Sequence, residues 1–445
     1  PPPRSVSAVP GRPGVPRWLS GLMISATLLF VLAAAFGLGR LGPGRGPSPG
    51  TPTAAQSDKA LALEFMRQGS PAKAIELLDG MVTRDPGDAE AHILKQNALA
   101  QLIGRPVIRL PVLTSATGPD GLDGVSLLHG VALAQAEVNQ AGGPGSRSLV
   151  VDVYDDQSQL PRGLALAQEI AERADYLVCV GPFNSQFTLG VEPLFNHAGL
   201  AFIAPVASDP GIWEAGPYIF TGSDSNLARE EVLARHFLSR HLKRGAILYD
   251  PDSLYSINMA EEFAEFLKEH GGEATCRVPY QEGAIQQVVE SRPQFVFLAD
   301  YRTRPLVEQL QALRRAGLKV PVAAQARLFN HELIRGLGAE AEGLLLSAYF
   351  HPDLPDPMVQ EFTRHFHQMF GELQPSHREA TAYDVVKLTL PALERPDATR
   401  RTVRDYLAGL DSYTGVTGTF APGRRLDRRK AYVIEIRQGR FELLP

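Results

Sequence analysis

The chain has few of the residues that hold small secreted domains together. Only two of its 445 residues are cysteine, Cys179 and Cys276, and only two are tryptophan. Cys179 lies in the apolar run of residues 176–180, which is typical of a buried strand. We therefore expect two free, partly buried thiols rather than a disulfide. This cysteine usage neither requires nor excludes an oxidising compartment.

The sequence also lacks an excess of positive charge. Its 44 lysine and arginine residues are outnumbered by 49 acidic residues, which gives a formal net charge of −5. Without a general basic field the chain is not expected to bind nucleic acid. A local basic run does occur at residues 424–430. Its position beside Asp427 predicts a solvated hairpin turn, with contact to lipid headgroups as the alternative.

Signatures of common active sites are absent from the sequence as well. It contains no Gly-x-Ser-x-Gly elbow, no phosphate-binding P-loop and no His-Glu-x-x-His zinc motif. His365 and His367 are two residues apart, so on a helix they would point to different sides and make a poor pair of metal ligands. These absences argue against an enzyme and against a metal or other cofactor.

One long uncharged segment, residues 18–39, lies near the N-terminus. It is long enough for a transmembrane helix, which needs about 20 apolar residues. The proline-rich tail of residues 1–17 is slightly more basic than the other flank, which favours a cytoplasmic N-terminus and an exported remainder. A secretory signal cleaved near residues 33–35 is the alternative, and it would export the remainder too. Because the chain begins with Pro1 rather than Met, we hypothesise that it is a piece of a longer protein with a cytoplasmic part.

Residues 40–57 and 58–103 differ in character. The first are rich in Gly, Pro and Ser, as in a flexible linker. The second have apolar residues at helical spacing, and they resemble one tetratricopeptide repeat followed by an extra helix at 89–102. Such a module would serve either as a spacer packed on the next domain or as a surface for a protein partner.

From residue 107 onward, short apolar runs alternate with amphipathic stretches. The runs predicted as strands are 107–113, 149–154, 177–180, 201–204, 246–249, 295–298, 320–323 and 344–347. The stretches predicted as helices are 124–140, 161–173, 185–197, 228–241, 257–270 and 305–316. This alternation predicts an α/β fold with parallel sheets covered by helices on both faces. The length exceeds one compact sheet, so we expect two lobes, with ligand-binding groups in the loops after the strands.

Five short sequence segments make the fold prediction more specific, because of their order along the chain. They are Thr117-Gly118-Pro119 and the segments at 181–185, 205–210, 341–344 and 383–388. With them, the segment from about 107 to 445 resembles the type I periplasmic binding protein fold, in the branch of branched-chain amino acid receptors.

The resemblance implies two hinged lobes that clasp a small ligand. It places residues of about 107–225 and 349–408 in the first lobe, and of about 225–348 and 409–445 in the second.

Candidate ligand contacts follow partly from the residues and partly from the resemblance. Residues 181–185 open a helix whose N-terminal N–H groups suit a carboxylate. Ser185 adds a hydroxyl there, with simple capping of the helix as the alternative. The resemblance implies that Val206 and Ser208 hold the α-amino and α-carboxylate groups of the ligand. It also implies that Tyr255 and Tyr301 of the second lobe lie over the ligand.

Two positions depart from the family's pattern. Asp123 stands where the family often has an aromatic residue. At 325–327 the family has an acidic residue that pairs with the ligand ammonium, whereas this chain has Gln325, an alanine and Arg327. Arg327 would repel an ammonium group and attract an anion, and Asp123 could supply the missing negative charge. Either the amino-acid pocket is rearranged or the ligand is not a simple α-amino acid.

The expected function is an extracytoplasmic, non-enzymatic binding protein for an amino acid or a related carboxylate or amide. The resemblance favours delivery of the ligand to an ABC permease. Two alternatives stay open. The first is a membrane-tethered sensor that signals to a cytoplasmic partner such as a kinase. The second is an interaction scaffold that uses the helical repeat.

Overall fold

The computed structural model describes residues 54–444, apart from Phe183, Arg428 and residues 224–225, 301–302, 326–336 and 424–425. The predicted membrane segment at 18–39 and its flanking residues therefore lie outside the described residues. Within the described part of the chain, no helix combines the length and the apolar character needed to cross a bilayer.

The N-terminal module consists of three helices, as predicted from the helical spacing. They are α2 (Ala54–Arg67), α3 (Pro71–Arg84) and α4 (Ala89–Ile103). Pro71 occupies the first turn of α3, where its missing N–H costs nothing. The Asp88 side chain accepts the Ala91 N–H and so caps α4. The helices bury a common set of apolar side chains, among them Leu78, Met81 and Leu94.

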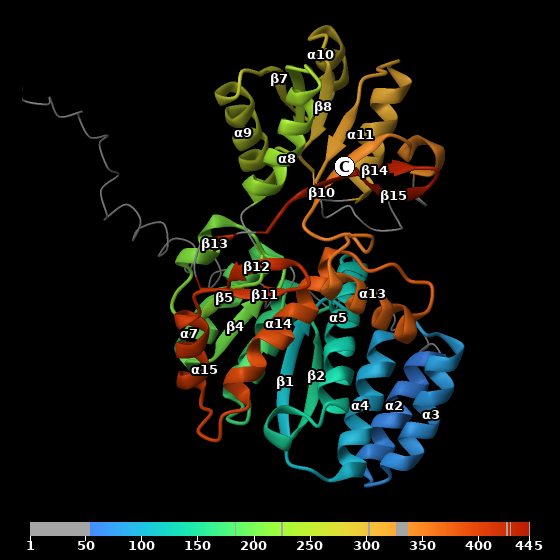
Figure 1. Ribbon diagram of the computed structural model, residues 1–445, viewed down its shortest axis with the longest axis vertical. Coiled ribbons are helices and arrows are strands. Elements are labelled where there is room, and N and C mark those ends of the chain that lie inside the picture. Colours follow the sequence, from blue (N-terminus) through green and yellow to red (C-terminus); the bar gives the residue numbers. More distant parts are fainter. Residues whose placement is uncertain are drawn as a thin grey trace, which may run out of the picture. The chain divides into compact units, whose positions relative to one another are not determined.

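A five-stranded parallel sheet forms the centre of the first lobe (Figure 1). In spatial order its strands are β2 (Ser148–Asp155), β1 (Val107–Thr114), β3 (Val178–Val180), β4 (Ala201–Ala204) and β5 (Ile219–Thr221). One face packs in a core with α5 (Gly121–Gln140), α13 (Pro357–Phe370), α14 (His377–Leu393) and α15 (Arg400–Gly409). The other face packs against α6 (Leu160–Glu172) and α7 (Ser185–Ala198). Helices on both faces confirm the predicted layering.

The second lobe contains a seven-stranded mixed sheet. In spatial order its strands are β15 (Arg440–Leu443), β14 (Tyr432–Arg437), β10 (Leu344–Ala348), β9 (Val322–Ala324), β8 (Phe295–Leu298), β6 (Arg244–Tyr249) and β7 (Glu273–Pro279). The strands from β10 to β7 are parallel, and β14 and β15 add an antiparallel edge. The helices packed on one face are α8 (Asn226–Ser239) and α9 (Leu254–Glu269). Those on the other are α10 (Ala284–Glu290) and α11 (Thr303–Arg315).

All eight predicted strands occur, but β5, β7, α10 and the three helices from α13 to α15 were not among the predicted elements. β5 has only three residues, too few to show a period. β7 mixes polar and charged residues with apolar ones, and only Val278 within it is buried. The closing strands β14 and β15 form a hairpin that turns at Gln438 and Gly439, which both have positive φ, as a two-residue hairpin turn requires.

A small third sheet, β11 (Tyr413–Gly415), β12 (Gly418–Ala421) and β13 (Leu426–Asp427), differs from the expected division. We expected the chain from 409 onward to belong to the second lobe. Val416 and Phe420 are instead buried in the core that surrounds the first sheet. The final passage into the second lobe therefore comes between β13 and β14.

Arg429, in that passage, corrects the predicted solvated turn. Its side chain is buried, and its Nη1 donates to the Gly222 carbonyl at 2.8 Å. Its guanidinium also stacks 4.8 Å from the ring centroids of Tyr349 and Phe420. Gly222 follows β5 and Tyr349 follows β10, so Arg429 connects the three segments that pass between the lobes. The other arginines of the basic run, Arg424, Arg425 and Arg428, lie outside the described residues.

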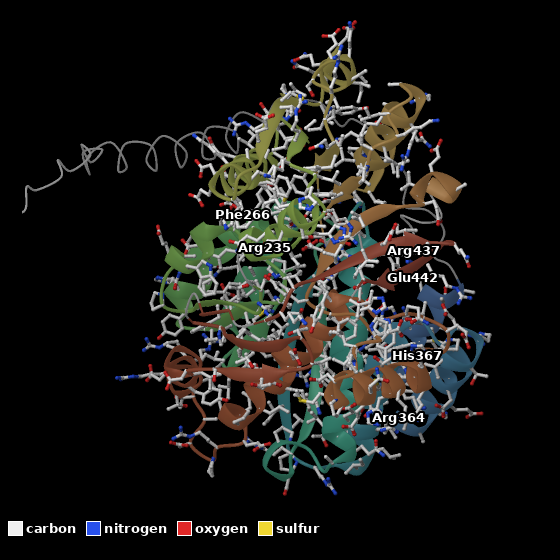
Figure 2. The ribbon with its side chains drawn as sticks, turned by 45° about the horizontal axis from the view of Figure 1, so that its top comes forward. Arg235, Phe266, Arg364, His367, Arg437 and Glu442 are labelled. Atoms are coloured by element: carbon white, nitrogen blue, oxygen red, sulfur yellow. The ribbon has the colours of Figure 1, made fainter. Side chains whose placement is uncertain are left out.

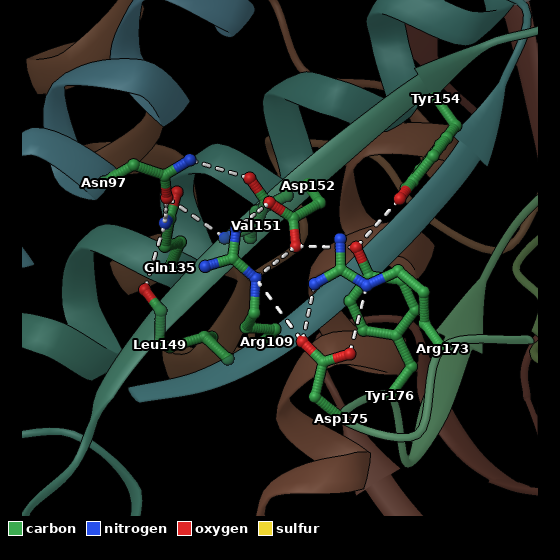
Figure 3. A network of polar contacts seen from close by, with 10 residues as sticks. All are labelled: Asn97, Arg109, Gln135, Leu149, Val151, Asp152, Tyr154, Arg173, Asp175 and Tyr176. Atoms are coloured by element: carbon green, nitrogen blue, oxygen red, sulfur yellow. Dashed lines mark hydrogen bonds and ion pairs between the residues drawn. The ribbon is translucent and has the colours of Figure 1, made fainter. Parts of the chain in front are cut away.

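The helical module is bound to the edge of the first sheet (Figure 3). β2 is the edge strand, and the Asn97 carboxamide of α4 pairs with it as another strand would. Asn97 Nδ2 donates to the Val151 carbonyl at 2.7 Å, and Asn97 Oδ1 accepts the Val151 N–H at 3.0 Å. Gln135 Nε2 donates to the same Asn97 oxygen at 2.8 Å. The module is thus packed on the next domain, and the edge strand is shielded from pairing with another chain.

Replacing Asn97 with alanine is expected to lower the free energy of unfolding by about 2 kcal/mol, because the buried Val151 N–H and C=O both lose their partner. Urea unfolding of the full chain measures the loss. Gln101→Ala is the matched control, since Gln101 is exposed on the same helix and donates only to the Met66 carbonyl among the described contacts. Equal stability of the two variants would contradict the docking role of Asn97.

Candidate functional site

The loops after β3 and β4 meet at the carboxyl edge of the first sheet through Ser185. Ser185 Oγ accepts the backbone N–H of Ser208 at 3.2 Å and that of Asp209 at 3.1 Å. The N-cap of α7 is Asn184, whose side chain accepts the Phe187 N–H at 2.7 Å. Ser185 is therefore not the capping residue; it holds two strand-end loops together.

Ser208 and Val206 lie in the second of these loops. Ser208 is buried, with 6% of its surface exposed. Val206 is half-buried and packs on the core of the first lobe. Thr221 Oγ1 donates to the Ala207 carbonyl at 2.6 Å, which fixes the backbone between them. Ser185 and Ser208, both candidate ligand contacts, thus lie together, and the backbone of the Ser208 loop is restrained from two sides.

Asp123, in the first turn of α5, has a cationic partner inside the first lobe. Its Oδ1 lies 3.0 Å from Nη2 of Arg378, whose side chain is only 2% exposed. The sequence made Asp123 a candidate source of negative charge for a ligand ammonium. The ion pair already balances that charge. Arg378 was not identified from the sequence, because the only segment noted in its helix was 383–388.

A buried carboxylate follows β2 at the same edge of the sheet. Asp156 is fully buried, and its Oδ1 accepts Ser115 Oγ at 2.5 Å and the Ser158 N–H at 2.7 Å. Its Oδ2 is buried without a hydrogen-bond partner among the described residues. Burial raises the pKa of Asp156 despite these donors. Asp156 and Ser115 join the ends of β1 and β2.

The second lobe places Tyr255 beside Gln325. Tyr255 lies in the first turn of α9, after β6, and its hydroxyl donates to Gln325 Oε1 at 2.7 Å. Gln325 directly follows β9 and is 3% exposed. Its Nε2 is buried with no partner among the described residues, so a donor is left for an incoming acceptor. The position of Gln325 at a strand end was the signal that could have identified it.

The remaining predicted contacts, Tyr301 and Arg327, lie outside the described residues. The neighbouring Asp300 is buried and accepts Gln309 Nε2 at 3.2 Å. Ser256 Oγ donates to the Ala299 carbonyl at 2.5 Å and so links the loops after β6 and β8. The strand-end loops of the second lobe are therefore tied to one another, as in the first lobe.

The other sequence predictions concern residues away from these loops. Both cysteines are free, as expected. His365 bonds to Glu137, with 2.7 Å between Nδ1 and Oε1. Burial alone would raise the pKa of Glu137, but hydrogen bonds from Tyr383, Lys387 and His365 lower it. The described residues contain no group of three or more side chains arranged to hold a metal ion.

Comparison with known proteins identifies the class to which this architecture belongs. The periplasmic binding protein family matches residues 107–440, three quarters of the chain. The chain belongs to this family, as the sequence resemblance predicted.

The relatives that match this chain include Leu/Ile/Val-binding proteins. The chain is 24% identical over 254 residues to the Leu/Ile/Val-binding protein of Citrobacter freundii, which covers 54% of this chain and 67% of that protein. It is 27% identical over 161 residues to Leu/Ile/Val-binding protein homolog 1 of Brucella abortus, covering 36% of this chain and only 43% of the relative. An ABC transporter substrate-binding protein from Desulfitobacterium hafniense, solved in complex with Leu, is 26% identical with a TM-score of 0.67, and the match covers 76% of this chain and all of that one.

Proposed function

We propose that the chain is an extracytoplasmic receptor that clasps a small polar ligand between its two lobes, such as an amino acid or a related carboxylate or amide. The Leu/Ile/Val-binding relatives support this ligand class, and delivery to an ABC permease is the use that they favour. Ligand binds one lobe first, and contacts from the other lobe then favour the closed state.

The observation that carries this proposal is the arrangement of polar groups at the strand ends of each lobe. Ser185 fixes the loop that contains Ser208, and Tyr255 fixes Gln325 with its amide donor unused among the described residues. Buried polar groups without partners are costly, so a ligand oxygen that accepts from Gln325 would be stabilised. An acid that could hold an ammonium group is absent from 325–327, which favours carboxylates and amides as ligands.

A thermal-shift screen of amino acids, small carboxylates and amides on the full chain tests the proposal. A true ligand at about 100 times its Kd stabilises the folded state by about 2.7 kcal/mol and raises Tm. Ser208→Ala and Arg327→Ala should reduce that shift, whereas Gln101→Ala should not. If no compound raises Tm, the interaction-scaffold alternative is favoured; if Arg327→Ala leaves every shift intact, pairing of an anion with Arg327 is wrong.

Replacing Ser185 with alanine is expected to weaken the affinity for that ligand by about tenfold. The reason is that Ser208 and Asp209 would lose the acceptor that positions their loop. Isothermal titration with the best compound from the screen measures the effect. Ser239→Ala is the control, since Ser239 is an exposed serine of α8 that bonds to the His236 carbonyl. Unchanged affinity in Ser185→Ala would show that the bridge does not shape the site.

The bound helical module favours one alternative use, a membrane-tethered sensor. Because Asn97 joins α4 to β2, the module would move with the first lobe. A tether through residues 18–39 would then transmit movement of the lobe to the membrane. Truncation before residue 54, followed by cell fractionation, tests the tether: the full chain should sediment with membranes and the truncated chain should not.

A further inference from the structure

The second lobe has a surface pocket at the edge of its sheet opposite to the loops described above. Those loops follow the carboxyl ends of β6, β8 and β9, whereas the pocket lies at the amino ends of β9 and β10, where Pro321 and Gly343 line it. Its volume is about 390 Å³. Pockets that hold small molecules span roughly 300–1,000 Å³, so the size is sufficient for a small organic ligand.

The inner wall of this pocket is apolar. Phe237 of α8 and Leu345 of β10 contribute from the core of the lobe. Phe237 is held by stacking on Phe295, with ring centroids 4.0 Å apart and planes 12° from parallel. Val320 and Leu444, which are half-buried, complete the apolar surface. An apolar group of a ligand would contact Val320 and Leu444, because Phe237 and Leu345 are buried behind them.

The rim of the pocket is cationic. Arg240, Arg314, Lys319 and Arg437 line it, and Glu435 is the acidic residue among the described lining residues. Glu435 is itself paired with Arg437, at 2.5 Å. This concentration of positive charge occurs in a chain whose net charge is −5, so it is a local feature and not a consequence of composition.

Two of these cations, Arg240 and Arg314, donate hydrogen bonds to neutral acceptors that do not offset their charge. Arg240 Nη1 donates to His236 Nδ1 at 2.9 Å. Burial, and then the charge of Arg240, lower the pKa of His236, so the imidazole stays a neutral acceptor at neutral pH. Arg314 Nη2 donates to the Glu342 carbonyl at 3.4 Å. Arg437, in contrast, also pairs with Glu442, with 3.7 Å between Nη1 and Oε2, and Figure 2 shows the two together on the closing hairpin, away from Arg235 and Phe266.

We infer that this pocket binds a small anion with an apolar body, of the class of aromatic or branched carboxylates and phosphate monoesters. The anionic group pairs with Arg240 and Lys319, and the apolar body packs on Val320 and Leu444. All lining residues belong to the second lobe, so occupancy does not require the cleft between the lobes to be filled or closed. The site is independent of the proposed function.

Isothermal titration of the full 445-residue chain with phenylacetate, phenyl phosphate and the neutral phenylacetamide tests the inference. We expect saturable binding of at least one anion and at least tenfold weaker binding of the amide. Arg240→Gln combined with Lys319→Gln should weaken anion binding by tenfold or more. Arg235→Gln is the matched control on α8, because Arg235 lies 5.0 Å over the Phe266 ring and does not line the pocket; it should stay within twofold of wild type.

Three results would overturn the inference. One is the absence of saturable binding of both anions at millimolar concentration. Another is wild-type affinity in the Arg240→Gln, Lys319→Gln variant, with its urea unfolding unchanged. The third is loss of anion binding in Ser208→Ala, which would place the anion in the cleft between the lobes. Failure of the proposed function, in contrast, leaves anion binding and its dependence on Arg240 unaffected.

Discussion

Replacing Gly130 with alanine is expected to destabilise the protein by about 3 kcal/mol or more, and replacement with valine is expected to prevent folding. Gly130 lies where α5 crosses α14 in the first lobe. A Cβ atom there would lie 2.1 Å from the Glu379 carbonyl oxygen, 2.9 Å from the Tyr383 nitrogen and 3.0 Å from the Ala382 Cβ. Two of these atoms are backbone, so the clash can be relieved only by moving a helix.

Gly80→Ala is the control for this prediction. Gly80 also lies inside a helix, α3, but the nearest atom to its added Cβ is a terminal nitrogen of Arg84 at 3.8 Å. Alanine there should be neutral or stabilising by up to about 1 kcal/mol, because it restricts the unfolded chain and favours the helix. Chemical unfolding of both variants measures the difference. Similar effects of the two substitutions would contradict the close approach of α5 and α14.

Replacing Asp384 with alanine is expected to cost about 3 to 5 kcal/mol at neutral pH. Asp384 is fully buried in α14, and its carboxylate accepts the Val416 N–H at 2.8 Å, the Thr417 N–H at 2.9 Å and the Thr417 hydroxyl at 2.7 Å. It thereby holds the turn between β11 and β12, where a Cβ on Gly415 would lie 2.3 Å from it. Asp405→Ala, which removes an exposed carboxylate of α15, should change stability by less than about 1 kcal/mol.

The same residue predicts a pH dependence of stability. Burial raises the pKa of Asp384 from its ordinary value of 3.8 to about 6. Because this pKa is higher in the folded state, the folded chain holds the proton more tightly than the unfolded chain. The stabilising contribution is complete below about pH 4 and is lost as pH rises to about 6, by about 3 kcal/mol in total.

Comparison with Asp384→Asn isolates this effect, since asparagine does not titrate. The stability of the wild type should fall relative to that of the variant between about pH 4 and pH 6, as measured by urea unfolding at intervals of half a pH unit. Parallel curves for the two proteins across this range would mean that Asp384 does not titrate in it.

Much of the architecture could be predicted from the sequence because strands and helices have different apolar periods. Every apolar run expected as a strand is one. Short or polar strands such as β5 and β7 were missed, because the backbone pairing that forms them is independent of the local sequence pattern.

Contacts between distant segments were the part that the sequence could not supply. A basic run predicts a solvated turn, yet Arg429 is buried. Its guanidinium donates a hydrogen bond to the Gly222 carbonyl and stacks on the ring of Tyr349, and both partners lie in other segments that pass between the lobes. Asp123 looks available until Arg378, 255 positions later, is seen to pair with it. Ser185 could be selected from the sequence as a candidate site residue, but its bond to the loop of Ser208 emerges only in three dimensions.

The central claim, that two lobes clasp a small polar ligand, is tested most directly by small-angle X-ray scattering with and without a saturating ligand. The ligand would be the compound that gives the largest thermal shift in the screen of amino acids, carboxylates and amides. The account predicts a smaller radius of gyration in its presence, and no such change in Ser208→Ala at the same concentration. A compound that binds with one-to-one stoichiometry, loses its binding in Ser208→Ala and still leaves the radius of gyration of the wild type unchanged would contradict the claim.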